Sequence, residues 1–159
     1  MNLRASATAM VVVTASFLSA VVLADEAKIE RGRYLVTIAG CNDCHTSGYA
    51  LQEGHVPESE WLKGDVLGWN GPWGTTYAPN LRLSLSKMSE DQWVGFARNL
   101  RARPPMPSVN LNQMKENDMR DLHAYITQLQ PLGDPAPDYL PPGVKPTGPH
   151  VRFPAPPPE

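Results

Sequence analysis

The sequence predicts a small all-α domain that wraps around a group the chain itself does not supply. Three segments place apolar residues at helical spacing, and no segment alternates convincingly between apolar and polar residues as a half-buried strand does. Between the first two of these segments, residues 46–79 form one long irregular stretch rich in glycine and proline. Such a stretch is uncommon in a compact domain unless it encloses something. A buried prosthetic group would account for it.

The first predicted helix covers residues 26–39. Four residues at helical spacing form its apolar face: Ile29, Gly32, Val36 and Ala39. Gly40 follows as a stop signal, because glycine readily adopts the left-handed conformation that ends a helix. The motif GCNDCHT, residues 40–46, therefore begins where this helix ends.

The second predicted helix begins after Ser89, which can cap it, and Gln92 completes a capping box. Its apolar stripe consists of Trp93, Phe96, Ala97 and Leu100. The third predicted helix covers residues 116–130, and Pro131 ends it. Its core-facing residues are Met119, Leu122, Tyr125, Ile126 and Leu129. These helices predict one domain over residues 25–130, about the size of a single small domain.

The N-terminus has the pattern of a secretory signal peptide. Arg4 precedes a long run of apolar and small residues that ends at Ala24. We therefore expect residues 1–24 to be removed, and the remaining protein to be periplasmic without a membrane span. The alternative is an uncleaved N-terminal anchor, because residues 5–24 are nearly long enough to cross a bilayer.

The C-terminal residues 131–159 contain 11 of the 17 prolines. Proline fixes φ and lacks an N–H, so this stretch cannot form a helix or a central strand and should run extended. Its interspersed apolar residues exceed what a linker needs and favour a strap docked on the domain over a solvated tail. They are Tyr139, Leu140, Val144, Val151 and Phe153.

The net charge of −2 does not suggest a nucleic-acid partner. The only two cysteines, Cys41 and Cys44, are spaced C-x-x-C and followed directly by His45. A zinc site would need further ligands at suitable spacing, which the sequence lacks. A redox-active dithiol calls for a preceding strand, where this sequence predicts a helix. A disulfide would not require the histidine, and so short a loop constrains little chain entropy.

Covalent attachment of haem uses all three residues. The thiols of Cys41 and Cys44 would form thioethers with the haem vinyl groups, and His45 would ligate the iron from one face. A single C-x-x-C-H motif predicts one haem c.

The other face of the iron decides between an electron carrier and a catalyst. Met106 is the favoured ligand, because it lies in the stiff loop Arg103-Pro104-Pro105-Met106-Pro107, where no predicted helix or strand explains an apolar side chain. A stiff loop lowers the entropy cost of holding a weak ligand. The alternative is that Met106 fills a gap in the core. The rival ligands are His55, His123 and His150.

Four stretches in order along the chain carry a family resemblance: RGRYLVTIAGCNDCHT, GPWGTTYAPNL, MSEDQWVGFARNL and RPPMPSVNLNQMKENDMRDLHAYI. The chain resembles the class I c-type cytochromes, and within them the cytochrome domains in haem subunits of bacterial alcohol, aldehyde and gluconate dehydrogenases. The resemblance covers nearly all of residues 31–126. It implies that Cys41 and Cys44 carry the haem and that His45 and Met106 ligate its iron.

The resemblance also implies that Gly32 and Tyr125 pack where the terminal helices cross, and that residues 77–80 run along the haem edge as a neighbour of a propionate. Lys115 departs from the serine-like cap that the family tends to have. Family members usually carry several such domains and a membrane-binding end, whereas this chain carries one C-x-x-C-H motif and a proline-rich strap.

Together these features predict a periplasmic monohaem cytochrome c that passes single electrons between redox proteins, such as a dehydrogenase and a terminal oxidase or respiratory complex. Electron transfer needs no acid, base or nucleophile, so the chain is not expected to be an enzyme. Two alternatives remain. One is a haem enzyme or a gas or redox sensor with a displaceable sixth ligand, and the other is a cytochrome subunit docked on a dehydrogenase.

Overall fold

The computed structural model describes residues 25–154. The first described element is a helix over residues 25–38, so the signal-peptide prediction for residues 1–24 lies outside the described part of the chain. The later helices are α2 (Cys41–His45), the 3₁₀ helix η1 (Glu58–Glu60), α3 (Leu81–Leu85), α4 (Glu90–Asn99), α5 (Ser108–Asn112) and α6 (Glu116–Gln128). None of the described helices is both long and apolar enough to span a bilayer.

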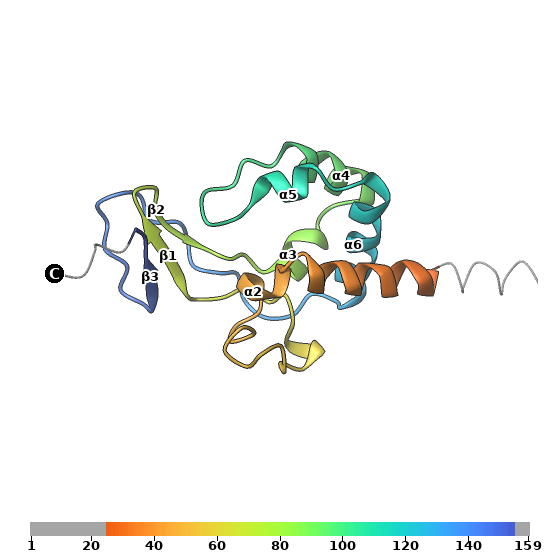
Figure 1. Cartoon of the computed structure of the whole chain (residues 1–159), viewed down its shortest axis with the longest axis horizontal. Coiled ribbons are helices and arrows are strands. Elements are labelled where there is room, and N and C mark those ends of the chain that lie inside the picture. The colour runs from red at the N-terminus through yellow and green to blue at the C-terminus, as the bar shows by residue number, and fades with distance from the viewer. Residues whose placement is uncertain (1–24, 155–159) are drawn as a thin grey trace, which may run out of the picture.

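The N-terminal helix crosses α6 at close range, as Figure 1 shows. A Cβ added at Gly32 would lie 2.6 Å from the Cβ of Tyr125, and closer still to the carbonyl oxygen of Asp121. Only glycine lets the two backbones approach this far. The prediction that Gly32 and Tyr125 pack at the helix crossing is confirmed.

The two later predicted helices are also present. The side chain of Ser89 accepts a hydrogen bond from the backbone N–H of Gln92, and the Gln92 side chain accepts one from Ser89, which confirms the capping box of α4. No side chain caps α6, whose N-cap residue is Lys115. The core joins these helices to the loop after α2, and its members include Leu35, Trp61, Leu62, Leu85, Trp93, Met119, Leu122, Tyr125 and Ile126.

Two predicted faces are slightly rotated. The first helix ends at residue 38, because Gly40 adopts a left-handed conformation with φ 68°. Ala39 therefore lies outside the helix and is exposed, whereas Leu35 is buried. In α4, Val94 is buried with Trp93 and Ala97, while Phe96 is 46% exposed.

The expectation of a purely all-α fold is wrong, because the chain also forms a small sheet of order β2-β1-β3. Strands β1 (Gly68–Gly71) and β2 (Gly74–Tyr77) form an antiparallel hairpin, and β3 (His150–Arg152) pairs with β1 in parallel. Strands of three or four residues are too short to show an alternating pattern. The proline-rich C-terminal stretch was not expected to form a central strand. Its one strand, β3, lies at the edge of the sheet and contains no proline, in agreement with that expectation.

The C-terminal strap, residues 131–154 in the described chain, runs along this sheet (Figure 1). Leu140 exchanges two backbone hydrogen bonds with Thr75 of β2, with N···O distances of 2.8 and 3.0 Å. The centroid of the Phe153 ring lies 6.0 Å from the ring centroid of Trp69 and 6.1 Å from that of Trp73. The strap is thus in contact with the domain through both backbone and aromatic side chains.

Candidate haem site

Helix α2 is a single turn that holds all three residues of the motif (Figure 1). Cys41 and Cys44 are half-buried and form no disulfide. Their spacing of three residues places them on the same side of the turn. Two free thiols on one side of a rigid turn match the requirement for two bonds to one flat group.

Both thiols are uncharged near neutral pH. Burial raises the pKa of the Cys41 thiol to about 11, and burial also raises the pKa of Cys44. Cysteines in redox-active C-x-x-C motifs have lowered pKa values, because their function needs the thiolate. This environment therefore argues against a dithiol–disulfide catalyst at this position.

His45 is held in one orientation. The side chain is 6% exposed, and its Nδ1 lies 2.8 Å from the carbonyl oxygen of Pro79. A carbonyl only accepts hydrogen bonds, so Nδ1 carries the proton and Nε2 keeps a free lone pair. Burial lowers the pKa of His45, although the hydrogen bond to Pro79 partly opposes this shift. A neutral imidazole oriented through its other nitrogen is the form that ligates metals.

The chain after α2 braces this helix. The Thr46 hydroxyl donates to Asn42 Oδ1 at 2.7 Å and accepts from the backbone N–H of Leu62, also at 2.7 Å. The N–H of Gly64 donates to the carbonyl of His45 at 2.8 Å. The Nδ2 of Asn42 is buried without a partner in the described chain, and a bound group carrying an acceptor would satisfy it.

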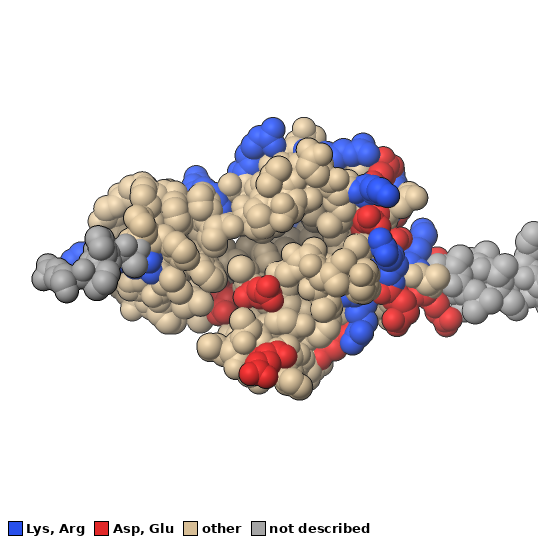
Figure 2. Space-filling view, viewed as in Figure 1, with Lys and Arg blue, Asp and Glu red and all other residues tan. Residues whose placement is uncertain are grey.

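The loop that carries Met106 lies across from α2. Figure 1 shows residues 100–107 and α5 on the opposite side of the molecule's centre from α2, and Figure 2 shows a hollow between these two parts. The face around the hollow carries few charged side chains (Figure 2). Met106 is half-buried, and Val109 of the adjoining α5 is 62% exposed. A hollow with few charged side chains around it fits a site for a large apolar group.

The rival histidines each contact a backbone carbonyl in another part of the chain. His55 contacts the carbonyl of Gln52 and His150 that of Gly148, both within their own loops. His123 contacts the carbonyl of Met88 at 2.9 Å, beside α4. Within residues 25–154, no three His, Cys, Asp or Glu side chains cluster in a way that could hold a metal ion.

Sequence reasoning missed one feature of the site, the Pro79 carbonyl that orients His45, although it expects residues 77–80 beside the haem. The expectation that this segment neighbours a propionate stays a prediction. Within the segment, Asn80 is buried and its side chain is committed to the protein. Its Oδ1 accepts from the N–H of Leu83, and its Nδ2 donates to the carbonyls of Leu132 and Asp134.

The residues present fit a covalently bound haem. Two free thiols share one helical turn with a fixed, neutral imidazole whose Nε2 is available, and Figure 2 shows a hollow with few charged side chains around it. The donor set is that of a c-type haem, with a thioether side chain in the loop across the hollow.

Comparison with known proteins agrees with this reading of the site. The sequence model of the family described as "Cytochrome c" matches residues 29–130. The chain is similar to the fructose dehydrogenase cytochrome subunit of Gluconobacter japonicus, with 29% identity over 120 residues. This match covers 69% of the present chain and 23% of the Gluconobacter protein, so the chain spans about a quarter of that subunit. No solved structure matches the chain.

Proposed function

The chain belongs to the cytochrome c family, and from that premise we propose that it is an exported monohaem electron carrier. Cys41 and Cys44 would hold the haem through two thioethers, and His45 and Met106 would be its axial ligands. The observation that carries the proposal is the hydrogen bond from His45 Nδ1 to the Pro79 carbonyl, which leaves Nε2 free in the same helical turn as two free thiols. When bound, the haem supplies a one-electron couple of iron.

The protein's own residues would set the reduction potential of the haem iron and would take no part in a chemical reaction. The hydrogen bond to Pro79 fixes the ring of His45 and increases its strength as a ligand. The mostly uncharged surroundings of the hollow would keep water from most of the bound group, and a thioether ligand from Met106 would raise the potential relative to a second histidine. No proton transfer or nucleophile is needed, so we propose a carrier and not an enzyme.

The similarity to a dehydrogenase cytochrome subunit supports a dehydrogenase as the electron donor. A terminal oxidase or respiratory complex is the proposed acceptor, and contacts with both would be small and transient, as in redox encounters generally. The apolar N-terminal stretch supports export to the periplasm with cleavage after Ala24. Attachment as a subunit of a dehydrogenase complex is the second candidate, favoured by the same similarity.

The first experiment is the absorption spectrum of the exported protein, produced with haem maturation enabled, in its oxidised and reduced forms. We expect a c-type reduced spectrum and, in the oxidised protein, the weak far-red band of methionine–iron ligation. Met106→Ala should abolish that band, lower the potential and allow carbon monoxide to bind the reduced protein. Met114→Ala is the control, because Met114 is half-buried against the core and should leave the band in place.

The possible results separate the candidates. A c-type spectrum without the far-red band would remove Met106 from the iron and favour a sensor or enzyme with an open sixth position. An unchanged band in Met106→Ala would assign the ligand elsewhere. Absence of covalent haem would contradict the assignment of Cys41 and Cys44.

A further inference from the structure

We propose that Tyr139 of the strap is a positioning residue for Met106. The inference rests on the proposed function, in that Met106 is taken as the iron ligand. Tyr139 lies more than thirty residues after Met106 in the sequence and belongs to the segment that follows the cytochrome domain. Its side chain nevertheless contacts the loop that carries Met106.

Tyr139 makes two contacts that join three segments. The guanidinium carbon of Arg103 lies 3.8 Å from the centroid of the Tyr139 ring, which is a close cation–π contact. The Tyr139 hydroxyl donates a hydrogen bond to the carbonyl of Trp73 at 2.7 Å. Trp73 lies in the turn between β1 and β2, and Arg103 is three residues before Met106. The ring therefore lies between the β1–β2 turn and the Met106 loop.

The Met106 loop has few other attachments. Residues 101–105 are all exposed, so little packing holds this part of the loop. Three hydrogen bonds anchor the loop to α5: Ala102 N–H donates to the Ser108 hydroxyl, Asn112 Nδ2 donates to the Leu100 carbonyl, and Arg101 Nη1 donates to Asn112 Oδ1. A contact from outside comes from Thr76 of β2, whose hydroxyl donates to the carbonyl of Pro104 at 2.8 Å. Both Thr76 and Tyr139 thus tie the loop to the hairpin and strap.

The strap and hairpin form a firm base for these contacts. Leu140, next to Tyr139, exchanges two backbone hydrogen bonds with Thr75, next to Thr76. A Cβ added at Gly74 would collide with the carbonyl oxygen of Leu140, so the strap approaches the hairpin as closely as glycine permits. If the loop swings away from α2, the Arg103–Tyr139 contact must break, because the ring is fixed to the hairpin.

The Met106 loop can be closed, with Met106 on the iron, or open, with Met106 away from it. The contacts to the strap stabilise the closed form relative to the open form. An added ligand that binds only the open form has an apparent affinity set by the population of that form. Loss of one cation–π contact and one hydrogen bond should raise that population about tenfold. Imidazole is a suitable probe, since it competes with Met106 for the oxidised iron.

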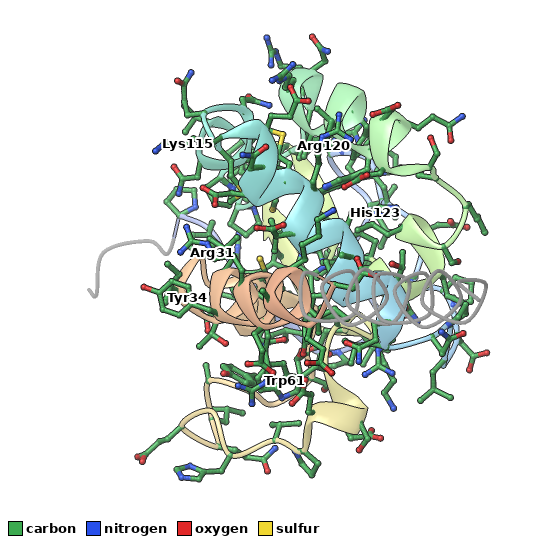
Figure 3. All side chains as sticks on the ribbon, turned by 90° about the vertical axis from the view of Figure 1, so that its right-hand side faces the viewer. Arg31, Tyr34, Trp61, Lys115, Arg120 and His123 are labelled. Carbon is green, nitrogen blue, oxygen red and sulfur yellow. The ribbon has the colours of Figure 1, made fainter. Side chains whose placement is uncertain are left out.

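The test measures imidazole binding to the oxidised, haem-loaded full chain. Tyr139→Leu should bind imidazole about tenfold more tightly than the parent, whereas Tyr139→Phe, which keeps the ring, should differ by only about threefold. Arg103→Gln should reproduce part of the effect and add little in combination with Tyr139→Leu. Tyr34→Leu is the matched control, because Arg31 also lies over the Tyr34 ring, at 5.5 Å, on the N-terminal helix (Figure 3).

The outcomes distinguish this inference from the function on which it rests. If the parent lacks the far-red methionine band, the proposed ligation fails, and with it the role of Tyr139. If the parent shows the band but Tyr139→Leu and Arg103→Gln bind imidazole no more tightly than the parent and Tyr34→Leu, the inference is overturned while the proposed function stands. Should Tyr139→Leu fail to fold, Arg103→Gln alone decides, because it leaves the strap sequence intact.

Discussion

The crossing of the N-terminal helix over α6 allows a quantitative prediction for Gly32→Ala. Within a helix, replacement of glycine by alanine normally raises the free energy of unfolding by about 1 kcal/mol. Here the added methyl group would lie 2.6 Å from Tyr125 Cβ and would also collide with the Asp121 carbonyl oxygen. Neither atom can rotate away, because one is backbone and the other is attached directly to it. The helices must separate, and overpacking of this kind costs about 1–3 kcal/mol or more.

We therefore expect Gly32→Ala to lower the free energy of unfolding by about 2 kcal/mol, against the usual helix preference. The matched control is Gly95→Ala in α4, where an added Cβ meets nothing within 4 Å and should be stabilising by about 0.5–1 kcal/mol. Urea unfolding of both haem-loaded variants beside the parent gives the comparison. If Gly32→Ala were as stable as Gly95→Ala, the helices would not cross at Gly32 as described.

Two other side chains allow predictions for stability. Burial alone would raise the pKa of Glu58, but hydrogen bonds from Tyr125 and Arg33 outweigh it and hold the pKa below its ordinary value of 4.5. The unfolded chain then binds the proton more readily, so Glu58 stabilises the fold above about pH 5 and less as the pH falls through its lowered pKa. Because the Glu58 side chain is 38% exposed, solvent screens its interactions, and Glu58→Gln should cost under about 1 kcal/mol at pH 7 and clearly less near pH 3. An equal loss at both pH values in urea unfolding would contradict this sign. Arg82 is 3% exposed and donates to four backbone carbonyls. In the same assay, Arg82→Met should lower the free energy of unfolding by about 3 kcal/mol or more. The control Arg101→Met, at an exposed position, should lower it by under about 0.5 kcal/mol.

The parts of the fold that the sequence predicted are those set by local signals. The stop at Gly40, the capping box at Ser89 and the core face of α6 each depend on residues within a few positions of one another. The sheet was missed for the opposite reason. Its strands are too short for a period to appear, and β3 is a strand only because it meets β1, roughly eighty residues earlier in the chain.

The candidate site divides in the same way. C-x-x-C-H is a local motif, so Cys41, Cys44 and His45 could be named from their spacing, and the structure adds the carbonyl that orients the histidine. Met106 could be suggested only from the stiffness of its loop. The residues around it do not indicate that this loop lies opposite α2 in the folded chain.

What holds the Met106 loop in place could not be read from the sequence at all. One contact comes from Thr76, in a strand that the sequence did not predict. The other comes from Tyr139, in a proline-rich segment for which the sequence favours docking on the domain over a solvated tail without indicating where it docks. Such contacts link segments far apart in the chain and depend on the path of the strap along the hairpin. If Met106 is the ligand proposed above, its binding depends on residues outside the C-x-x-C-H motif. A strap variant should then change how readily Met106 leaves the iron while leaving covalent attachment of the haem intact.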